Sequence, residues 1–380
     1  MKKIKIVFII GKLDIGGAAM ALYDLITLMD KSKYDVSVFV QFDDGELEQK
    51  YREAGICVVH LFERRVRDGS VVRFVKHQIR KIRILCCLHN RYKGILDFFF
   101  PEGVDIAVDY SSWEAGFIAF GKHNKTVKFI HGDPEDNLHF LQYLTGIKDI
   151  LPLYNKTICV SRKCYDSYRR IMGISEGVEC HYNPIISDNI RSLAESEMDG
   201  LDGVPYLCAV GRLAPEKAYD RLIRIHRKIL DRGIAHRLMI VGEGKERKNL
   251  EAIIRETGTE DTVQLVGFQK NPYPYMKNSY CVVCSSYTEG LPVIAMESLI
   301  LGVPFISAVP SVGEIFGDTN CGIITENNDE SLEEGIVKML SNRDFYKNAK
   351  QGALNRSGFF DGGSMVKEIE KLFDELMKGF

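Results

Sequence analysis

The sequence lacks the features that mark membrane-spanning, exported and nucleic-acid-binding chains. No segment reaches the roughly 18 apolar residues of a membrane-spanning helix. The start, Met1-Lys2-Lys3, is followed by only Ile4–Ile10 before polar residues return, and we interpret this run as a first strand rather than a secretory signal. A formal net charge of -2 lacks the basic excess by which a domain binds nucleic acid. We therefore expect a cytoplasmic protein with no nucleic-acid partner.

The ten cysteines lack both the two closely spaced ligand pairs that together form a zinc site and the regular framework of a disulfide-rich domain. They are scattered through segments with strand or helix patterns, and Cys86 and Cys87 are adjacent. Buried, reduced thiols in a cytosolic protein are the simpler interpretation, so we predict no metal site.

A chain of 380 residues exceeds what one ordinary hydrophobic core accommodates, which indicates two domains. In the first half, short apolar runs alternate with helix-length amphipathic segments. This alternation predicts a parallel sheet covered by helices on both faces. The seven runs are Ile4–Ile10, Val36–Val40, Ile56–Leu61, Val104–Val108, Val127–Ile130, Thr157–Val160 and Val178–His181.

A polar, weakly periodic stretch, Pro184–Val204, separates this pattern from a second one of the same kind. Its apolar runs are Tyr206–Val210, His236–Val241, Thr262–Val266, Tyr280–Ser285 and Pro304–Ala308, with helical segments at Tyr219–Leu230, Arg247–Glu256 and Val293–Leu301. Two successive doubly wound sheets place a ligand site at the facing carboxyl ends of their strands.

The predicted fold class is therefore α/β, with two Rossmann-like domains facing each other across a cleft. We expect an amino-terminal domain over residues 1–185, a linker over 186–204 and a second domain over 205–360. Residues 361–380 form a carboxy-terminal segment, whose amphipathic part Met365–Met377 could pack on either domain.

The strongest motif is Glu289-Gly-Leu-Pro-Val-Ile-Ala-Met-Glu297, directly after the apolar run Tyr280–Ser285. Pro292 suits the first position of a helix, so we expect Glu289 in the preceding loop and Glu297 inside the helix. Backbone amides and the positive end of the helix dipole then favour a bound anion, and carboxylates accept hydrogen bonds from sugar hydroxyls. A helix-terminal acid followed by an exposed glutamate is an equally weighted alternative for this motif alone.

A second motif, Val210-Gly-Arg-Leu-Ala-Pro-Glu-Lys217, follows the run Tyr206–Val210. Its two cations, Arg212 and Lys217, suit a diphosphate, because a planar guanidinium binds two oxygens while an ammonium acts as a mobile point charge. Fixed cations would stabilise a departing nucleoside diphosphate as negative charge builds on it. Taken alone, the pair fits a solvated loop better than a binding site.

Two glycine-rich loops follow predicted strands without completing a nucleotide fingerprint. Gly242-Glu-Gly244 begins a dinucleotide pattern, but Arg247 occupies the place of the third glycine. The loop Gly11-Lys-Leu-Asp-Ile-Gly16-Gly17 is not followed by the Gly-Lys-Ser/Thr of an ATPase phosphate loop. It still predicts a turn into a helix near Ala18 that brings backbone close to a phosphate. A simple packing turn is an equal alternative.

His131-Gly132-Asp133 comes just after the run Val127–Ile130 and therefore lies at the carboxyl edge of the first predicted sheet. A histidine at this edge can donate a hydrogen bond to a sugar hydroxyl or orient a neighbouring group. A structural role is the commoner one for a single histidine at a strand end.

Together, these motifs resemble those of glycosyltransferase family 4, the retaining group with the GT-B fold, in the same order along nearly the whole chain. The likeness is strongest in the second half, where the ordered set is specific although no single part is. The matching elements are Gly211-Arg212 with Glu216-Lys217, Val241-Gly-Glu-Gly244, Val266-Gly-Phe268, and Glu289 to Glu297 followed by Gly302-Val-Pro304.

The resemblance implies roles for residues that bind a nucleoside-diphosphate sugar. It implies the catalytic groups Arg212 and Lys217 on the diphosphate, Glu289 on the hydroxyls of the transferred sugar, and His131 beside that sugar. The implied donor-binding residues are Gly17, Gly211, Gly242, Gly244, Phe268 beside the base, Gly290, Leu291, and Glu297 on the ribose. It also implies retention at the anomeric carbon with no cofactor and no required metal, since the cations take the place of a metal ion.

Residues 64–93 carry ten Lys and Arg residues and one acid, Asp68. Apolar residues interleave with the basic ones at helical spacing. Such a helix can lie on an anionic membrane surface, and the solvated face of a core-packed helix is an equally weighted alternative. Our hypothesis is peripheral association with the inner face of a membrane, and a lipid-linked acceptor.

The sequence thus predicts a glycosyltransferase of the hexosyltransferase type. Its donor would be a UDP- or GDP-sugar and its acceptor a glycan or a lipid-linked molecule, in the biosynthesis of a surface polysaccharide. One alternative is a nucleotide-sugar epimerase of the same fold, which needs paired acid and base groups around the sugar. The other is a non-catalytic nucleotide-sugar-binding module in the cytosol; the missing export signal and the diphosphate-directed cations disfavour only a periplasmic binder.

Overall fold

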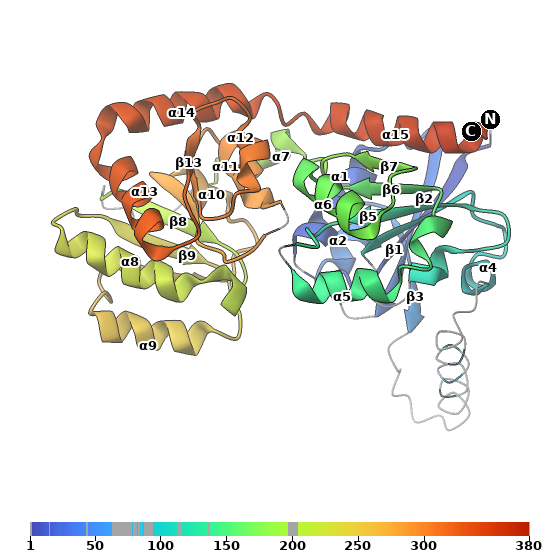
Figure 1. Ribbon diagram of the computed structural model, residues 1–380, viewed down its shortest axis with the longest axis horizontal. Coiled ribbons are helices and arrows are strands. Elements are labelled where there is room, and N and C mark those ends of the chain that lie inside the picture. The colour runs from blue at the N-terminus through green and yellow to red at the C-terminus, as the bar shows by residue number, and fades with distance from the viewer. Residues whose placement is uncertain are drawn as a thin grey trace. The chain divides into compact units, whose positions relative to one another are not determined.

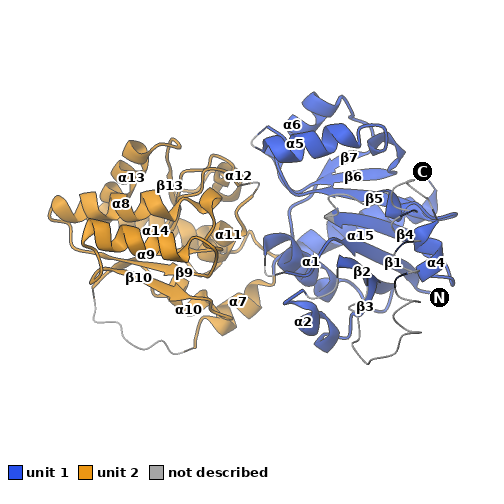
Figure 2. Ribbon diagram, turned by 90° about the horizontal axis from the view of Figure 1, so that it is seen from below, with its two compact units in different colours: residues 1–185, 362–380 blue, residues 186–361 orange. Residues whose placement is uncertain are grey.

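The computed structural model describes residues 2–14, 16–42, 45–62, 78, 82, 84, 86, 94–111, 116–135, 137–196, 204–289 and 291–379. Most of the predicted basic segment 64–93 lies outside these residues. Two compact units result, one of residues 1–185 with 362–380 and one of residues 186–361 (Figure 2). Within the described ranges, no helix has both the length and the apolar character that a membrane crossing requires.

The first unit contains a seven-stranded parallel sheet in the order β3-β2-β1-β4-β5-β6-β7 (Figure 1). Its strands are β1 (Ile4–Ile10), β2 (Tyr34–Phe42), β3 (Cys57–Phe62), β4 (Ile106–Ser111), β5 (Lys125–Ile130), β6 (Lys156–Cys159) and β7 (Val178–Cys180). Each lies on one of the seven predicted runs. The direction of winding reverses between β1 and β4, which is the topological switch point of the sheet.

Strand β1 shows why these runs are apolar throughout. Successive side chains of a strand point to opposite faces, and both faces of this sheet are covered. Ile6 and Phe8 lie in one hydrophobic cluster, whereas Val7 and Ile9 lie in another on the opposite face. The covering elements of the unit are α1 (Gly17–Leu28), α2 (Glu48–Glu53), α4 (Ile95–Phe99), η1 (Gly116–Ala119), α5 (Leu138–Gly146), η2 (Leu151–Leu153), α6 (Arg162–Met172) and α15 (Gly362–Lys378).

The carboxy-terminal helix α15 packs on the first unit, beside α1, which decides the question that the sequence left open. Its buried face joins the cluster that contains β1, and its members are Val366, Ile369, Leu372, Phe373 and Leu376. At the rim of this contact, the Tyr34 hydroxyl donates a hydrogen bond to Asp374 Oδ1 at 2.8 Å. The last residues of the chain therefore complete the core formed by the first.

The second unit contains a six-stranded parallel sheet in the order β10-β9-β8-β11-β12-β13. Its strands are β8 (Tyr206–Val210), β9 (Arg237–Val241), β10 (Val263–Gly267), β11 (Cys281–Cys284), β12 (Phe305–Ser307) and β13 (Gly322–Ile324). The first five lie on predicted runs, and β13 was not predicted. Winding reverses between β8 and β11, so the loops after these two strands flank the switch point of this sheet.

Helices cover both faces of the second sheet (Figure 1). Helix α8 packs against α9 and α13, whereas α11 packs against α7 and α14. The elements are α7 (Ser187–Leu193), η3 (Pro215–Lys217), α8 (Tyr219–Asp231), α9 (Arg247–Thr257), α10 (Tyr273–Lys277), α11 (Val293–Ile300), α12 (Val312–Phe316), α13 (Asp329–Ser341) and α14 (Arg343–Ser357). Two Rossmann-like α/β units are thus present, as the sequence predicts.

Part of the predicted linker 186–204 is structured and belongs to the second unit. Residues Ser187–Leu193 form α7, which contacts α10 and α11 and buries Ile190. The side-chain amide of Asn271 donates to the carbonyl of Leu193 at 2.8 Å and fixes the end of this helix. The chain therefore enters the second unit earlier than the polar composition indicates.

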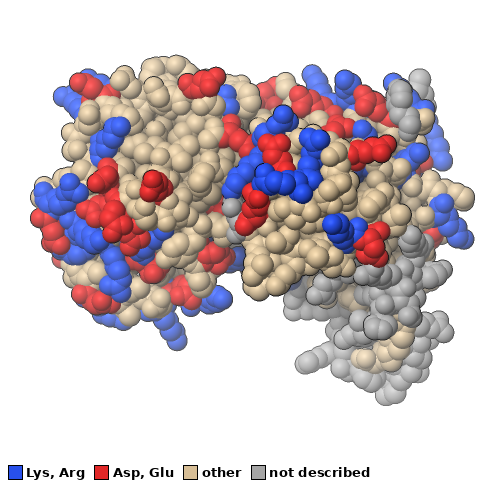
Figure 3. Space-filling model, in the orientation of Figure 1, with Lys and Arg blue, Asp and Glu red and all other residues tan. Residues whose placement is uncertain are grey.

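The outer helices α8 and α9 carry acidic and basic side chains interspersed on their surface (Figure 3). Arg224 pairs with Glu256 at 2.9 Å, and Arg247 pairs with Glu251 at 3.0 Å. Exposed pairs of this kind stabilise a fold by only about 0–1 kcal/mol.

Candidate active site

Polar and charged side chains gather at the carboxyl edge of the second sheet, beside its switch point. The loop from β8 to α8 carries Arg212 and Lys217, and the loop from β11 to α11 carries Ser286 and Glu289. Because β8 and β11 are parallel neighbours, their following loops leave the sheet side by side. This is the place where open α/β sheets bind ligands.

Lys217 and Glu289 form the centre of this site. Lys217 Nζ lies 2.5 Å from Glu289 Oε1, with the two side chains 24% and 19% exposed. The Ser286 hydroxyl donates to the same carboxylate oxygen at 2.7 Å. Two donors therefore hold the glutamate, and its side chain remains accessible. A group that exchanges its protein partners for those of a substrate needs such access.

Two hydrogen bonds to backbone carbonyls hold the two loops together independently of that ion pair. The Ser285 hydroxyl donates to the carbonyl of Lys217 at 2.8 Å, and the amide of Tyr287 donates to the carbonyl of Glu216 at 2.9 Å. Ala218 adopts a left-handed conformation, with φ of 51°, that turns the chain from η3 into α8. The position of Lys217 is thus fixed from both of its sides.

The glycines predicted after β8 and β9 allow their loops to approach closely. Gly242 has φ of 149°, and a Cβ atom there would lie 1.9 Å from the carbonyl oxygen of Gly211. A Cβ atom on Gly244 would lie 2.3 Å from the carbonyl oxygen of Leu213. Since neither position has room for a side chain, these glycines set the spacing of the loops around the site.

Gly211 and Tyr219 line the site beneath Lys217. A Cβ atom on Gly211 would lie 2.7 Å from the Tyr219 hydroxyl and 3.5 Å from Cε of Lys217. Burial, followed by the nearby Cys284 and Glu289, raises the pKa of Tyr219 well above its ordinary value. Tyr219 is therefore a neutral hydroxyl group that can serve as a hydrogen-bond donor at the floor of the site.

Arg212 lies apart from the central pair. Its side chain is 70% exposed and forms an ion pair with Glu216 at 2.9 Å. Burial disfavours the charged form of Glu216, but hydrogen bonds from its own backbone amide and from Arg212 outweigh burial and lower its pKa. Glu216 thus stays ionised and holds the guanidinium, which must change partner to contact a diphosphate.

The remaining predicted donor-binding residues of this unit surround the same edge. Glu297 lies on α11 and accepts a hydrogen bond from the Tyr273 hydroxyl at 3.1 Å. Phe268 follows β10 and is 51% exposed, while Leu291 is partly buried just before α11. Gly290 lies outside the described residues.

The predicted site residues of the first unit are His131 and Gly17. Gly17 is exposed and begins α1. The His131 ring stacks on Phe129 and contacts Tyr110, with ring centroids 5.8 and 4.4 Å away. Burial, followed by the charge of Lys128, lowers the pKa of His131 to about 4. His131 is thus neutral at physiological pH, and its buried Nε2 atom has no partner among the described residues.

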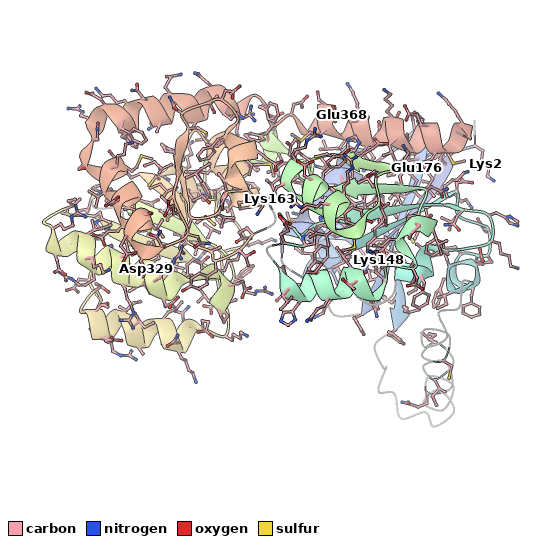
Figure 4. All side chains as sticks on the ribbon, viewed as in Figure 1. Lys2, Lys148, Lys163, Glu176, Asp329 and Glu368 are labelled. Carbon is pink, nitrogen blue, oxygen red and sulfur yellow. The ribbon has the colours of Figure 1, made fainter. Side chains whose placement is uncertain are left out.

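Asp133, two residues further along, has a structural role. It is buried and accepts hydrogen bonds from the Ser167 hydroxyl at 2.7 Å and from the amide of Glu135 at 2.9 Å. Lys163, in the first turn of α6, lies 3.3 Å from its other oxygen (Figure 4). These contacts fix the loop that follows His131.

Two residues of the site, Ser286 and Tyr219, are not among those that the sequence predicts. Ser286 is 2% exposed and orients Glu289, and a signal for it existed, since two serines follow directly after the apolar strand β11. The sequence pattern predicts Tyr219 only as the first residue of a helix. Its hydroxyl reaches Gly211 because the left-handed Ala218 directs the first turn of α8 toward the sheet edge.

The described residues contain no group of three or more histidine, cysteine, aspartate or glutamate side chains that could hold a metal ion. Cys281 and Cys284 are separated by two residues in the sequence, but both are buried within β11. Burial raises the pKa of each thiol, so both are protonated.

Part of the chain that contains this site is similar to a known family. Residues 194–356 match the family model described as glycosyl transferases group 1. The matched residues run from the end of α7 into α14 and include Gly211, Lys217 and Glu289. The carboxylate, the ammonium and the close glycine turns at the switch point therefore all lie in the part of the chain that this family shares.

Curated relatives show the same likeness over part of their length. The chain is 31% identical over 196 residues to an enzyme of Campylobacter jejuni named N-acetylgalactosamine-N,N'-diacetylbacillosaminyl-diphospho-undecaprenol 4-alpha-N-acetylgalactosaminyltransferase, covering 51% of this chain and 52% of the relative. It is 26% identical over 162 residues to the amylovoran biosynthesis glycosyltransferase AmsD of Erwinia amylovora, covering 42% and 45%. The matched part thus spans about half the length of these relatives.

Solved structures show the fold of the whole chain. Anabaena HepE in complex with UDP and glucose superposes with a TM-score of 0.75 at 17% identity, covering 98% of this chain and 100% of that one. Sucrose-phosphate synthase from Thermosynechococcus elongatus gives a TM-score of 0.76 at 15% identity, covering all of both chains. The two Rossmann-like units are therefore those of the GT-B fold, which confirms the predicted fold class.

Proposed function

We propose that this protein is a glycosyltransferase that moves a sugar from a nucleoside-diphosphate donor, a UDP- or GDP-sugar, to a glycan or lipid-linked acceptor. The observation that carries the proposal is the pairing of Lys217 with Glu289 at the switch point of the second sheet. There a cation pairs with a carboxylate that can accept hydrogen bonds from sugar hydroxyls. Both residues lie within the part of the chain that matches the glycosyl transferase group 1 model.

The proposed chemistry follows from the charges of these two groups. As the bond between sugar and diphosphate breaks, negative charge builds on the departing diphosphate, and the Lys217 ammonium stabilises it. Glu289 accepts hydrogen bonds from sugar hydroxyls. In the structure the two groups neutralise each other. A donor offers each a new partner, phosphate oxygens for the lysine and hydroxyls for the glutamate.

The names of the relatives support the proposed classes of donor and acceptor. The Campylobacter relative is named for transfer onto a diphospho-undecaprenol-linked sugar, and the Erwinia relative for biosynthesis of the polysaccharide amylovoran. The Anabaena structure contains UDP and glucose. We accordingly place this protein in surface polysaccharide biosynthesis, and we propose that segment 64–93 associates with an anionic membrane. Pelleting with anionic but not with neutral vesicles tests this association.

Retention at the anomeric carbon and independence from metal ions are further parts of the proposal. In this account Arg212 and Lys217 supply the positive charge that a metal ion supplies in other transferases. Turnover that is unchanged by a chelator, and a product with the anomeric configuration of the donor, are the expected results. A requirement for a divalent cation would contradict the role given to these side chains.

The deciding experiment is a panel of UDP-, GDP- and ADP-sugars, each scored for thermal stabilisation and for slow hydrolysis of the donor. We expect one nucleotide family to stabilise the protein and to be hydrolysed, because only a ligand bound to the native state raises its stability. Release of an epimerised sugar would indicate the epimerase instead. Stabilisation without any turnover, even with acceptor lipid present, would indicate a binding module.

A further inference from the structure

Arg221, on the first turn of α8, is a buried cation outside the proposed catalytic groups. Its side chain is 4% exposed, and its Nη1 atom donates to Asn327 Oδ1 at 2.9 Å. The Nε and Nη2 atoms are buried without a hydrogen-bond partner among the described residues. Within those residues no carboxylate lies in ion-pair contact with the guanidinium.

The guanidinium lies against the ring of Tyr287, with its central carbon 4.9 Å from the ring centroid. Asn327, which accepts from Arg221, donates through Nδ2 to the carbonyl of Tyr287 at 2.7 Å. It lies two residues before Asp329, which begins α13 (Figure 4). The amide of Tyr287 donates to the carbonyl of Glu216 at 2.9 Å. Three elements thus hold Tyr287 by its ring, its carbonyl and its amide.

Tyr287 joins these contacts to the candidate active site. It directly follows Ser286, whose hydroxyl donates to Glu289 at 2.7 Å, and it precedes Glu289 by two residues. The ring of Tyr287 is 53% exposed, so packing in a core does not hold it in place. Arg221 and Asn327, together with the backbone hydrogen bond to Glu216, therefore hold this part of the loop between β11 and α11 in place.

The stability of the fold does not explain a buried arginine with two guanidinium nitrogens that have no hydrogen-bond partner among the described residues. Burying polar groups without partners is unfavourable, and well-packed apolar side chains often replace buried charges with no loss of stability. An apolar side chain at position 221 would avoid this cost but could neither stack as a cation on Tyr287 nor donate to Asn327. Arg221 therefore fixes the position of the loop that contains Tyr287 and does not raise the stability of the fold.

We propose that Arg221 is a positioning residue for the transfer reaction, acting through Tyr287 and Asn327 on the loop that presents Ser286 and Glu289. This inference rests on the proposed function, because its kinetic consequence concerns the handling of a nucleotide sugar. Arg221 makes no contact with Lys217 and takes no part in the chemistry itself. Arg221 affects Glu289, the group that contacts the transferred sugar. The binding of a nucleotide that carries no sugar does not depend on Arg221.

The test compares Arg221→Met with Arg224→Met, which alters an arginine on the same helix that pairs with the exposed Glu256. We expect Arg221→Met to keep the melting temperature and the Kd for UDP or GDP, whichever the wild type binds, within twofold. Its kcat for sugar transfer should fall at least tenfold, while Arg224→Met retains wild-type kinetics. Arg221→Met with wild-type kcat would overturn the proposal, as would equal losses of nucleotide binding and turnover.

A second measurement is independent of activity and of the stability of that variant. Hydrogen exchange at the amide of Tyr287, followed in the whole protein, should accelerate at least tenfold in Arg221→Met and in Asn327→Ala, with unchanged exchange in the core of α8. Unchanged protection of Tyr287 in both variants would refute the positioning role. If the wild type turns over no nucleotide sugar at all, the proposed function fails, and the exchange result still decides the role of Arg221.

Discussion

At the scale of single residues, Glu289 depends on two donors that share one of its oxygens, Lys217 and Ser286. Ser286 is almost fully buried, so its hydroxyl has a fixed direction and limits the rotamers of the carboxylate. A carboxylate placed in this way needs little reorganisation when it meets a substrate hydroxyl.

Ser286→Ala should therefore lower kcat/KM for the donor by about tenfold, or about 1.4 kcal/mol of transition-state stabilisation. The fold should remain intact, because the change removes one oxygen atom and leaves the ion pair between Lys217 and Glu289. Steady-state kinetics beside Ser341→Ala, an exposed serine at the end of α13, provide the comparison. Equal kcat/KM for both variants would show that Ser286 does not orient the glutamate.

His226 and His236 form a buried pair in the second unit. Their Nδ1 and Nε2 atoms lie 2.8 Å apart, and His236 Nδ1 contacts the carbonyl of Ile234 at 3.0 Å. Burial, with smaller contributions from His236 and Arg227, lowers the pKa of His226 to about 3. Burial also lowers the pKa of His236. Both rings are neutral in the folded protein.

This pair makes the second unit sensitive to acid. An unfolded histidine has a pKa near 6.5, so above that pH neither state binds the proton. As the pH falls below 6.5, the unfolded chain binds protons that the folded pair does not bind, because burial lowers the pKa of both histidines. Stability then falls by up to about 1.4 kcal/mol per pH unit for each histidine.

Urea denaturation between pH 7 and pH 4 measures this loss. The variant carrying His226→Leu and His236→Leu should lose less stability over this interval than the wild type does. His139→Gln, a change at an exposed histidine of α5, should leave the pH dependence unaltered. Parallel pH profiles for the wild type and the double variant would exclude the pair as the source of acid sensitivity.

At the scale of elements, the glycine turns after β8 and β9 determine how closely two loops of the site approach. A Cβ atom on Gly242 would lie 1.9 Å from the carbonyl oxygen of Gly211, and the φ of 149° disfavours any side chain. Gly242→Ala should cost about 3 kcal/mol through strain and overpacking and displace Gly211 from beside Lys217.

Gly146→Ala is the matched control, because nothing lies within 4 Å of a Cβ atom at this last residue of α5. It should leave stability unchanged or raise it by up to about 1 kcal/mol, since alanine restricts the unfolded chain. Thermal unfolding and donor turnover are measured for both. Gly242→Ala with the stability and activity of Gly146→Ala would contradict the close approach of the loops.

Helix α15 stabilises the first unit from the far end of the chain. Phe373 is fully buried and contacts Phe8 and Tyr34 edge to face, with ring centroids 6.3 and 6.4 Å apart. Phe373→Ala should destabilise the protein by about 3–5 kcal/mol. Lys371→Ala, at an exposed position of the same helix, should have no effect. Equal free energies of unfolding for the two variants would show that α15 lies outside the core.

Elements with strong patterns could be predicted, and those with weak patterns could not. The interior strands are apolar throughout because both faces of each sheet are covered. Strand β13 (Gly322–Ile324) lies at the edge of its sheet and none of its residues is buried, so it lacks the apolar pattern of an interior strand. Helix α7 buries only Ile190 among seven residues, so its composition resembles that of a linker.

At the scale of the whole molecule, the order of the elements predicts where the site lies, but the sequence does not show which side chains meet there. Lys217 and Glu289 are 72 residues apart, and each could be proposed because it follows an apolar strand. The contacts of Arg221 with Tyr287 and with Asn327 bring together the start of α8, the loop after β11 and the loop after β13. No local sequence pattern predicts these contacts.

The central claim is that Lys217 grips the diphosphate of a nucleotide sugar while its sugar departs. Lys217→Ala, measured for transfer and hydrolysis of the donor that stabilises the wild type, tests this most directly. Lys228→Ala, at an exposed lysine of α8, is the control. We predict at least a hundredfold loss of kcat for Lys217→Ala, or about 2.7 kcal/mol, with an unchanged melting temperature and wild-type kinetics for Lys228→Ala. Undiminished turnover by a folded Lys217→Ala protein would contradict the account.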